Sequence, residues 1–315
     1  MRISVIVPTF NRREIVLRTV QSLDAQTFSA DDYELIVVVD GSTDGTVEAM
    51  RALRPACQMR LIEQSNRGIA AARNAGLQAA VGSLVLFIDD DMTCSPELLA
   101  RHVEAHKTGE DIVAFGAIFL SADSPPSLAA ECFKHELGAF YLRQVRSGEI
   151  PWNTVECVFS NTSLARLPLL RIGGFDESFR MREDLELGVR LCQAGMRAYY
   201  VRSAVAYQYY AKTSAQLIRD AEVFALSDVL FAQKHAGSPI QGQWEKYAQR
   251  PLWQRALLGG IARHSILADA LLAGVCMVGE QFFEIPFLRY VGMRALQMRR
   301  RIHWHHKILE FGEPS

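Results

Sequence analysis

Three adjacent aspartates, Asp89, Asp90 and Asp91, directly follow a short apolar run from Leu84 to Ile88. Neighbouring carboxylates repel one another unless a cation or hydrogen-bond donors compensate their charge. Hard divalent cations such as Mg²⁺ and Mn²⁺ prefer oxygen ligands and often share them with a diphosphate. A solvated acidic turn is the alternative for such a triplet, but its place at a strand end favours a metal site.

Three further carboxylates lie at the ends of patterns that predict a strand or a helix. Asp40 ends a β-branched run, where it could accept a hydrogen bond from a base or a ribose. A simple turn aspartate is the alternative interpretation. Glu183 and Asp184 precede a helical apolar pattern. Asp184 could act there as a general base, and ordinary helix N-terminal charge is the alternative.

Basic and imidazole side chains offer weaker signals. Arg67 and Arg73 flank the start of an alanine-rich helix, where guanidinium groups suit a diphosphate, although surface arginines are common on helices. His102 and His106 lie four residues apart on an expected helix. This spacing can bind zinc, but the glutamate of the metalloprotease motif is missing, which favours a core or surface role.

An alternation of short apolar runs and helices positions these residues. The runs that predict strands are 3–7, 35–39, 60–63, 84–88 and 112–120. Such an alternation predicts a largely parallel sheet with helices on both faces. Because ligands bind at the carboxyl ends of the strands in such sheets, Asp40 and the three aspartates should face one crevice.

The composition excludes several classes of protein. The chain has 315 residues, 49% hydrophobic and 22% charged, with a formal net charge of -1, which allows a large core and does not suggest binding to nucleic acid. None of the six cysteines forms a CxxC pair, which suggests reduced thiols. No apolar run approaches the about 20 residues of a membrane span, so we expect a cytoplasmic protein.

Taken together, the motifs resemble glycosyltransferase family 2, from about Arg2 to about Tyr210. The resemblance rests on the order and spacing of five segments: Ser4 to Asn11, Val39 to Thr46, Asn66 to Gly76, Asp89 to Asp91, and Gly173 to Glu177 followed by Glu183-Asp184. It implies an α/β fold of GT-A type, with a mixed, mainly parallel sheet flanked by helices and a helical C-terminal region. The expected parts are a nucleotide-sugar-binding half at 1–120, an acceptor-side half at 121–212 and a helical region at 213–315.

The resemblance also implies roles for individual residues. Asp184 is the catalytic base, Asp91 holds Mn²⁺ or Mg²⁺ bridging the diphosphate, Asp90 contacts the ribose and Asp40 binds the base. The remaining donor-side positions are Pro8, Thr9, Phe10, Arg67, Arg73 and Asn161. Two positions depart from the family: Val39 replaces a first aspartate before Asp40, and Gln208 stands where many members have a histidine.

The predicted function is metal-assisted, inverting transfer of a sugar from a nucleotide-diphosphate donor, with UDP favoured and dTDP and GDP open. The acceptor is a carbohydrate, a lipid-linked compound or a small molecule, bound by the segment from Trp152 to Phe179 and the C-terminal third. Trp152 is expected either to stack on a sugar or to lie in the core. The basic run Arg299 to Arg301 beside Trp304 suggests peripheral contact with a membrane, with a solvated helix end as the alternative.

Two other functions remain open at this point. A nucleotidyltransferase would need a glycine-rich loop after the first strand, and the segment from Pro8 to Arg13 has no glycine. A non-catalytic protein that binds sugar nucleotides is compatible with the altered position Gln208, whereas the presence of both Asp91 and Asp184 favours an enzyme.

Overall fold

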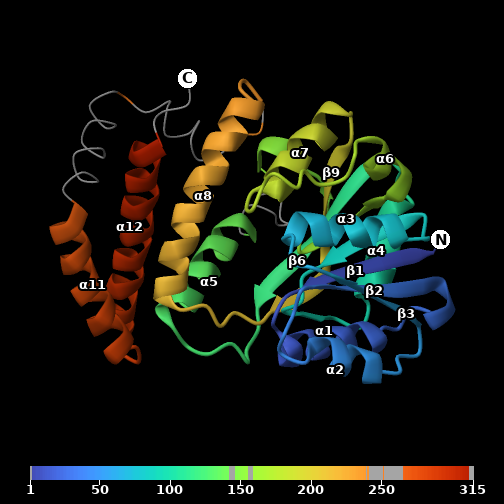
Figure 1. Ribbon diagram of the computed structural model, residues 1–315, viewed down its shortest axis with the longest axis horizontal. Helices are drawn as coiled ribbons and strands as arrows, with labels where there is room; N and C mark the ends of the chain where they lie inside the picture. Colours follow the sequence, from blue (N-terminus) through green and yellow to red (C-terminus); the bar gives the residue numbers. More distant parts are fainter. Residues whose placement is uncertain are drawn as a thin grey trace. The chain divides into compact units, whose positions relative to one another are not determined.

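The computed structural model describes residues 2–141, 146–154, 159–238, 240, 251 and 265–311. The chain forms two compact units. Unit 1 comprises Met1–Ala122 and Phe140–Tyr209, and unit 2 comprises Asp123–Ala139 and Tyr210–Ser315. Figure 1 shows that unit 1 contains the sheet and that unit 2 is helical.

Unit 1 is built on one mixed sheet with the strand order β3-β2-β1-β4-β8-β6-β9-β5, with β7 against β9. The strands are β1 (Ile3–Thr9), β2 (Tyr33–Asp40), β3 (Gln58–Gln64), β4 (Leu84–Ile88), β5 (Met92–Cys94), β6 (Ile112–Leu120), β7 (Gly148–Glu149), β8 (Asn161–Ala165) and β9 (Arg197–Gln208). The pairs among β1 to β4 are parallel, whereas β8 runs antiparallel to both β4 and β6. The mixed sheet expected from the sequence is therefore present.

The strand order fixes which helix covers which face. The chain steps outward from β1 to β2 and to β3, and then returns past β1 to β4. Because such crossovers are right-handed, α1 (Arg13–Asp24) and α2 (Thr46–Ala52) must cover one face and α3 (Ile69–Ala79) the other. Figure 1 shows this arrangement. The order of the strands reverses between β1 and β4, which is where ligands bind in open α/β sheets.

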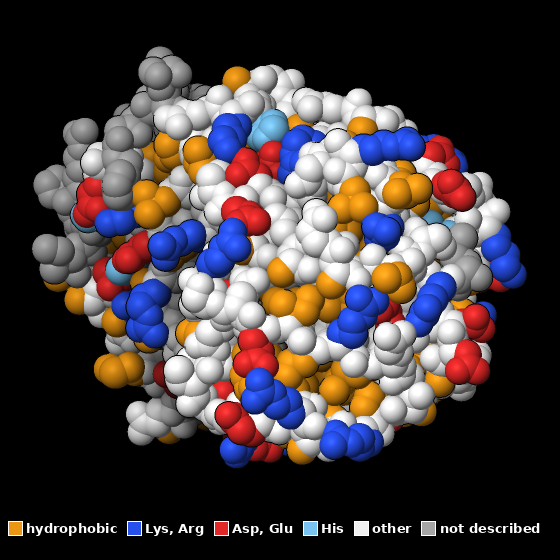
Figure 2. Space-filling view, turned by 45° about the vertical axis from the view of Figure 1, so that its right-hand side comes forward, with side chains coloured by type: hydrophobic (Ala, Val, Ile, Leu, Met, Phe, Trp, Pro, Cys, Tyr) orange, Lys and Arg blue, Asp and Glu red, His pale blue; other side chains and the backbone are white. Residues whose placement is uncertain are grey.

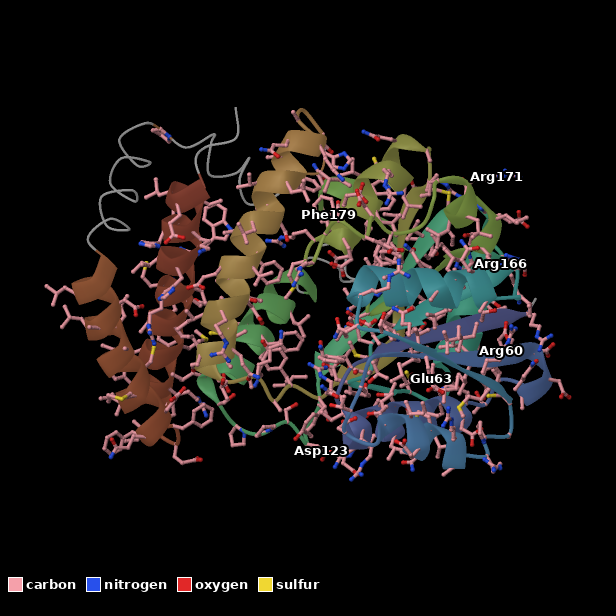
Figure 3. All side chains as sticks on the ribbon, viewed as in Figure 1. Arg60, Glu63, Asp123, Arg166, Arg171 and Phe179 are labelled. Carbon is pink, nitrogen blue, oxygen red and sulfur yellow. The ribbon has the colours of Figure 1, made fainter. Side chains whose placement is uncertain are left out.

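The central strands are apolar because both of their faces are covered. All residues of β1, β2 and β4 are buried. Glu34 is a polar exception, and its carboxylate accepts hydrogen bonds from Ser4 Oγ at 2.6 Å and from the Val81 N–H at 2.9 Å. It also pairs with Arg60 of β3, labelled in Figure 3. Burial opposes the charge, but these hydrogen bonds lower the pKa of Glu34 below its usual value.

Helix α3 lies against β1 at a glycine. A Cβ at Gly76 would stand 2.4 Å from Ile6 Cγ2, which is closer than two carbon atoms can approach. The absence of a side chain therefore sets how deeply α3 packs on the sheet.

Helix α4 (Leu98–His106) buries both of its histidines against β8. His102 contacts Ser163 Oγ through Nδ1 at 2.8 Å and Asn161 Oδ1 through Nε2 at 2.9 Å, and His106 Nε2 lies 2.9 Å from the same hydroxyl. Asn161 Nδ2 donates to the carbonyls of Ala117 and Ala204. The core role of the histidines is confirmed, and the amide of Asn161, expected near the donor sugar, is instead engaged in this buried network.

Unit 2 contains α5 (Leu128–Tyr141), α8 (Ser214–Lys234), α11 (Ser265–Gln281) and α12 (Pro286–Phe311). Trp304 is 5% exposed and donates from Nε1 to Asp228 at 2.8 Å. Arg299 forms a two-point ion pair with Asp269 at 2.8 and 2.9 Å, and Arg300 pairs with Glu136. Trp304, Arg299 and Arg300 therefore pack within unit 2, whereas Arg301 of the same basic run is exposed.

Large exposed apolar side chains occur along α11, the turn after it and the start of α12: Leu267, Leu271, Val275, Met277, Val278, Phe282, Ile285, Phe287 and Tyr290. No helix within the described part of the chain is long and apolar enough to span a bilayer. On the face shown in Figure 2, basic and acidic side chains are interspersed with apolar ones.

Because His102 and His106 are buried, we predict that the protein becomes less stable as the pH falls. Burial lowers the pKa of both His102 and His106 to about 4, well below the value of about 6.5 in an unfolded chain. The unfolded state therefore binds protons first, and the stabilisation that is complete above about pH 6.5 is lost as the pH falls toward 4. At pH 5.5 we expect the free energy of unfolding to fall by about 1 kcal/mol per histidine, measured by urea denaturation. In His106→Gln this pH dependence should weaken; an unchanged slope would contradict the assignment.

Candidate functional site

The carboxyl ends of β1 and β4 meet at the point where the strand order reverses. Thr9 Oγ1 donates to Asp90 Oδ2 at 2.7 Å, and Thr19 Oγ1 of α1 donates to the backbone carbonyl of Asp90 at 2.6 Å. Pro8 lies within the buried strand, whereas Phe10 follows it with 45% of its surface exposed. Thr9 and Asp90 thus form one corner of the site, and Phe10 is accessible beside it.

Asp40 anchors the loop that precedes α3. Its Oδ1 accepts hydrogen bonds from Gln64 Nε2 at 2.7 Å and from the Arg67 N–H at 2.9 Å, and its Oδ2 accepts from the Gly68 N–H at 2.8 Å. A carboxylate has about four lone-pair sites, so the described contacts leave one of them on Oδ2. Asp40 can therefore shape the loop and still accept one hydrogen bond from a ligand.

Asp91 lies between an amide and a guanidinium. The pairing of Met92 with Gln208 between β5 and β9 brings Gln208 Nε2 to 3.2 Å from both oxygens of Asp91. Arg12 lies 3.1 Å from Asp91 Oδ2 and 2.9 Å from Asp90 Oδ1. Burial, with the charges of Asp90 and Asp89, raises the pKa of Asp91 to about 7 despite these contacts.

These carboxylates suit a cation that a substrate helps to hold. Among the described residues, no three His, Cys, Asp or Glu side chains form a ready-made metal cage. Magnesium-type ions, however, commonly take one or two protein carboxylates and complete their shell with substrate phosphates and water. Burial is the main reason that the pKa of Asp91 is raised, and the charges of Asp90 and Asp89 add to it. A cation beside Asp91 would offset both effects, so the donor set fits a metal bound together with a diphosphate.

The two arginines of the α3 region lie in different surroundings. Arg67 is largely exposed and pairs with Glu177 at 2.7 Å. Arg73 is 2% exposed and donates from one terminal nitrogen to Asp89 at 2.9 Å and from the other to Glu183 at 2.8 Å. Arg73 therefore joins the aspartates after β4 to the start of α7 (Glu183–Gln193). Arg73 and Glu183 are 110 residues apart in the chain.

Asp184 lies in the first turn of α7 and accepts a hydrogen bond from the Leu185 N–H at 2.7 Å. Burial and the adjacent charge of Glu183 raise the pKa of Asp184 above its usual value, and Arg73 and Arg182 oppose this shift. A carboxylate with a raised pKa is a stronger proton acceptor than an ordinary aspartate, as a general base requires.

Arg12 was not singled out from the sequence, and neither Asp89 nor Glu183 was given a role of its own. All three contact predicted site residues. Three adjacent carboxylates need positive charge nearby. Arg12 comes three residues after the end of β1, the strand next to β4, so this need could have pointed to it. Trp152 is partly buried: its Nε1 donates to the Met196 carbonyl at 2.7 Å, and its ring meets Phe115 edge-on. Residues 155–158 of the expected acceptor segment lie outside the described residues.

The candidate site thus consists of the aspartate cluster after β4 and the carboxylates at the start of α7, joined by Arg73. The sequence profile described as Glycosyl transferase family 2 matches residues 4–166, which is more than half of the chain. The chain therefore belongs to glycosyltransferase family 2, a family of sugar-transferring enzymes.

Curated relatives agree with this assignment. Validoxylamine A glucosyltransferase of Streptomyces hygroscopicus subsp. jinggangensis is 29% identical over 224 residues, covering 62% of this chain and 52% of that protein. Chondroitin synthase of Escherichia coli is 29% identical over 237 residues, covering 65% and 34%. The first relatives are matched over 48% to 62% of their own length, so the matched region is about half of each.

Solved structures share the fold. The mannosyltransferase PcManGT of Pyrobaculum calidifontis, in complex with GDP-Man and Mn²⁺, superposes with a TM-score of 0.63 at 22% identity, covering 96% of this chain and 86% of that one. S. aureus TarS 1–349 with UDP-GlcNAc gives 0.59 at 16% identity, covering 99% and 93%. The expected fold, of GT-A type with a helical C-terminal region, is confirmed.

The anchoring role of Asp40 predicts a loss of stability on conservative substitution. Asp40→Asn keeps the shape but has one acceptor oxygen, so its NH₂ group must face one of the N–H donors of the 66–68 loop. We expect the free energy of unfolding to fall by about 1–3 kcal/mol in chemical denaturation. Glu97→Gln, which alters an exposed pair with Arg101, is the control and should change it little. Equal stability of the two variants would show that Asp40 does not hold this loop.

Proposed function

We propose that the chain transfers a sugar from a nucleotide-diphosphate donor to an acceptor hydroxyl with inversion, with Asp184 as the general base and Asp91 as the metal-binding carboxylate. The observation that carries the proposal is the guanidinium of Arg73, which joins Asp89 of the strand-end cluster to Glu183, the neighbour of Asp184. Through it, carboxylates suited to the donor and to the acceptor belong to one connected site.

The donor side uses the ends of β1, β2 and β4. The free lone pair of Asp40 Oδ2 accepts an N–H of the base, and the exposed ring of Phe10 lies at the entrance of this region. Asp90, held by Thr9, is offered to the ribose. UDP is favoured because uracil presents one N–H to such an acceptor. Neighbouring structures with UDP-GlcNAc and GDP-Man keep both UDP and GDP as candidates.

Asp91 would hold Mn²⁺ or Mg²⁺ together with the donor diphosphate, and such an ion stabilises negative charge on a leaving phosphate oxygen. The chain's own contribution is to orient Asp91: Gln208 donates to both of its oxygens, and Asp90 is fixed independently by Thr9. Arg12, already beside both aspartates, adds positive charge to the same region.

Asp184 takes the proton of the acceptor hydroxyl. The acceptor oxygen forms a bond to the anomeric carbon while the bond from that carbon to the diphosphate oxygen breaks, and the nucleotide diphosphate leaves with the electron pair. A single displacement from the opposite face inverts the configuration and requires no nucleophile from the protein. Its raised pKa makes Asp184 a stronger proton acceptor than an ordinary aspartate.

The proposed location is the cytoplasmic side of a membrane, with contact through α11 rather than through the tail. Exposed Leu267, Leu271 and Val275 recur at intervals of four residues along α11, and Phe287 and Tyr290 are exposed at the start of α12. Aromatic and apolar side chains beside Arg289 are typical of a helix resting at a lipid surface.

The roles of Asp184 and Asp91 are tested by substitution. We expect Asp184→Asn and Asp91→Ala to lower kcat by about 10²–10⁴-fold, because the first loses the proton acceptor and the second the metal ligand. Nucleotide release is measured with Mn²⁺ from UDP-glucose, UDP-GlcNAc and GDP-mannose, with the UDP donors expected to react fastest. Glu97→Gln is the matched surface control. Near-normal turnover by Asp184→Asn would remove it as the base, and turnover independent of added metal would remove the role of Asp91.

Membrane contact is tested by flotation with vesicles of phosphatidylcholine and phosphatidylglycerol. We expect the protein to float with the vesicles and Leu271→Glu or Phe287→Glu to remain at the bottom of the gradient, because each places a charge on the exposed apolar face. Leu167→Glu, at an exposed leucine of unit 1, serves as the control. Failure of the unaltered protein to float, or self-association through α11 seen by light scattering, contradicts the lipid partner.

A further inference from the structure

Arg73 carries a positive charge in the interior of unit 1. A buried guanidinium is costly unless negative charge and hydrogen-bond acceptors surround it. Its two terminal nitrogens meet this need by donating to Asp89 and Glu183, and the guanidinium carbon lies 5.3 Å from the centre of the Phe175 ring. Nε–H has no hydrogen-bond partner among the described residues. The groups that a diphosphate would engage first are therefore already bound to carboxylates.

The planar fork of an arginine fixes direction as well as distance. Two nitrogens of one rigid group hold two carboxylates in a defined relative position, which a lysine ammonium cannot do. One carboxylate belongs to the residue that directly follows β4, and the other belongs to the first residue of α7. Because Asp184 is the next residue after Glu183, its backbone position depends on this contact.

The residue after Arg73 fastens the same segment from its other end. Asn74 Nδ2 donates to the Phe175 carbonyl at 2.9 Å, and the Phe175 N–H donates back to Asn74 Oδ1 at 2.8 Å. The approach needs Gly174, which has a φ of +68° and whose Cβ would stand 2.5 Å from Asn74 Oδ1. Two consecutive residues of α3 thus hold both ends of the chain between Phe175 and Glu183.

The ring of Phe175, which lies against the Arg73 guanidinium, belongs to an aromatic cluster. Phe87, Phe159 and Phe175 pack edge-to-face, with ring centres 5.1 to 6.1 Å apart. Phe87 lies in β4, so the ring under Arg73 is fixed to the strand that ends at the aspartates. Arg73 is therefore held from the sheet, from α3 and from α7, which leaves little freedom for it to swing toward a ligand.

We propose that Arg73 and Glu183 are positioning residues that hold Asp184 in register with the strand-end aspartates, rather than contacts to the donor. This inference rests on the proposed role of Asp184 as the base. It replaces the sequence-based expectation that Arg73 lies against the diphosphate. The guanidinium acts on the reaction through Glu183 on one side and Asp89 on the other.

The test separates kcat from donor affinity in Arg73→Lys and Glu183→Gln. We expect kcat for nucleotide release to fall on the order of 10²-fold, because a displacement of Asp184 by about 1 Å is costly. The Kd of UDP and of GDP, measured by calorimetry with Mn²⁺, should stay within about twofold. The kcat of the double variant should be no lower than that of the more impaired single variant, because both changes break the same contact.

The surface pair Arg51–Glu63, at 2.6 Å, provides matched controls: Arg51→Lys and Glu63→Gln should retain full kcat. A weakening of nucleotide binding by about tenfold with kcat retained would make Arg73 a donor contact and overturn the inference. Additive losses in the double variant would also overturn it. Should Arg73→Lys fail to fold in thermal unfolding, Glu183→Gln, a neutral replacement of equal size, decides alone.

The experiment separates a failure of the positioning role from a failure of the proposed function. If Asp184→Asn retains turnover, the assignment of the base fails whatever Arg73 does. If Asp184→Asn is inactive while Arg73→Lys and Glu183→Gln keep full kcat, only the positioning role fails.

Discussion

The burial of the Arg73 charge is the constraint on which the arrangement of the site depends. Once α3 packs on the sheet, its guanidinium loses water and must find acceptors. Asp89 and Glu183 supply them from positions 16 and 110 residues away along the chain. The packing of the interior and the arrangement of the site therefore depend on the same contacts, because the segment that carries Asp184 also supplies an acceptor for the buried charge.

The sheet prepares the other half of this arrangement. Its parallel strands reverse their order between β1 and β4, so Thr9 and Asp90 meet where no crossover helix blocks the edge. The antiparallel insertion of β8 then carries the chain toward the 173–184 segment. Asp91 is contacted by a third segment: the pairing of β5 with β9 brings Gln208 within hydrogen-bond distance of it. Three separate parts of the chain thus converge on one group of acids.

Much of the fold could be predicted from the sequence, because covered strands are continuous apolar runs. All five predicted strand runs lie within β1, β2, β3, β4 and β6. The aspartates at strand ends were also recognisable, since their place on the sheet edge follows from the runs before them. Two short strands, β5 and β7, of three and two residues, carry too little pattern to be seen in this way.

The partners of the site residues could not be predicted, because they depend on packing between distant segments. The direction of Asn161 follows from an irregular register between β6 and β9 at Gly116, where a Cβ would stand 2.2 Å from Asn161 Nδ2. Nothing in the local sequence of β8 indicates that this amide turns to His102. Likewise, the apolar neighbours of Trp304 became evident only when α8 and α12 were placed side by side within unit 2.

Gly76 allows α3, the helix that carries Arg73, to pack closely on the sheet. It lies three residues after Arg73, about one turn along α3, and touches Ile6 of β1 without an intervening side chain. Even a methyl group there would lift the helix away from the strand and draw the guanidinium back from both acids at once. The position of Arg73 therefore depends on a residue in the interior that has no side chain of its own.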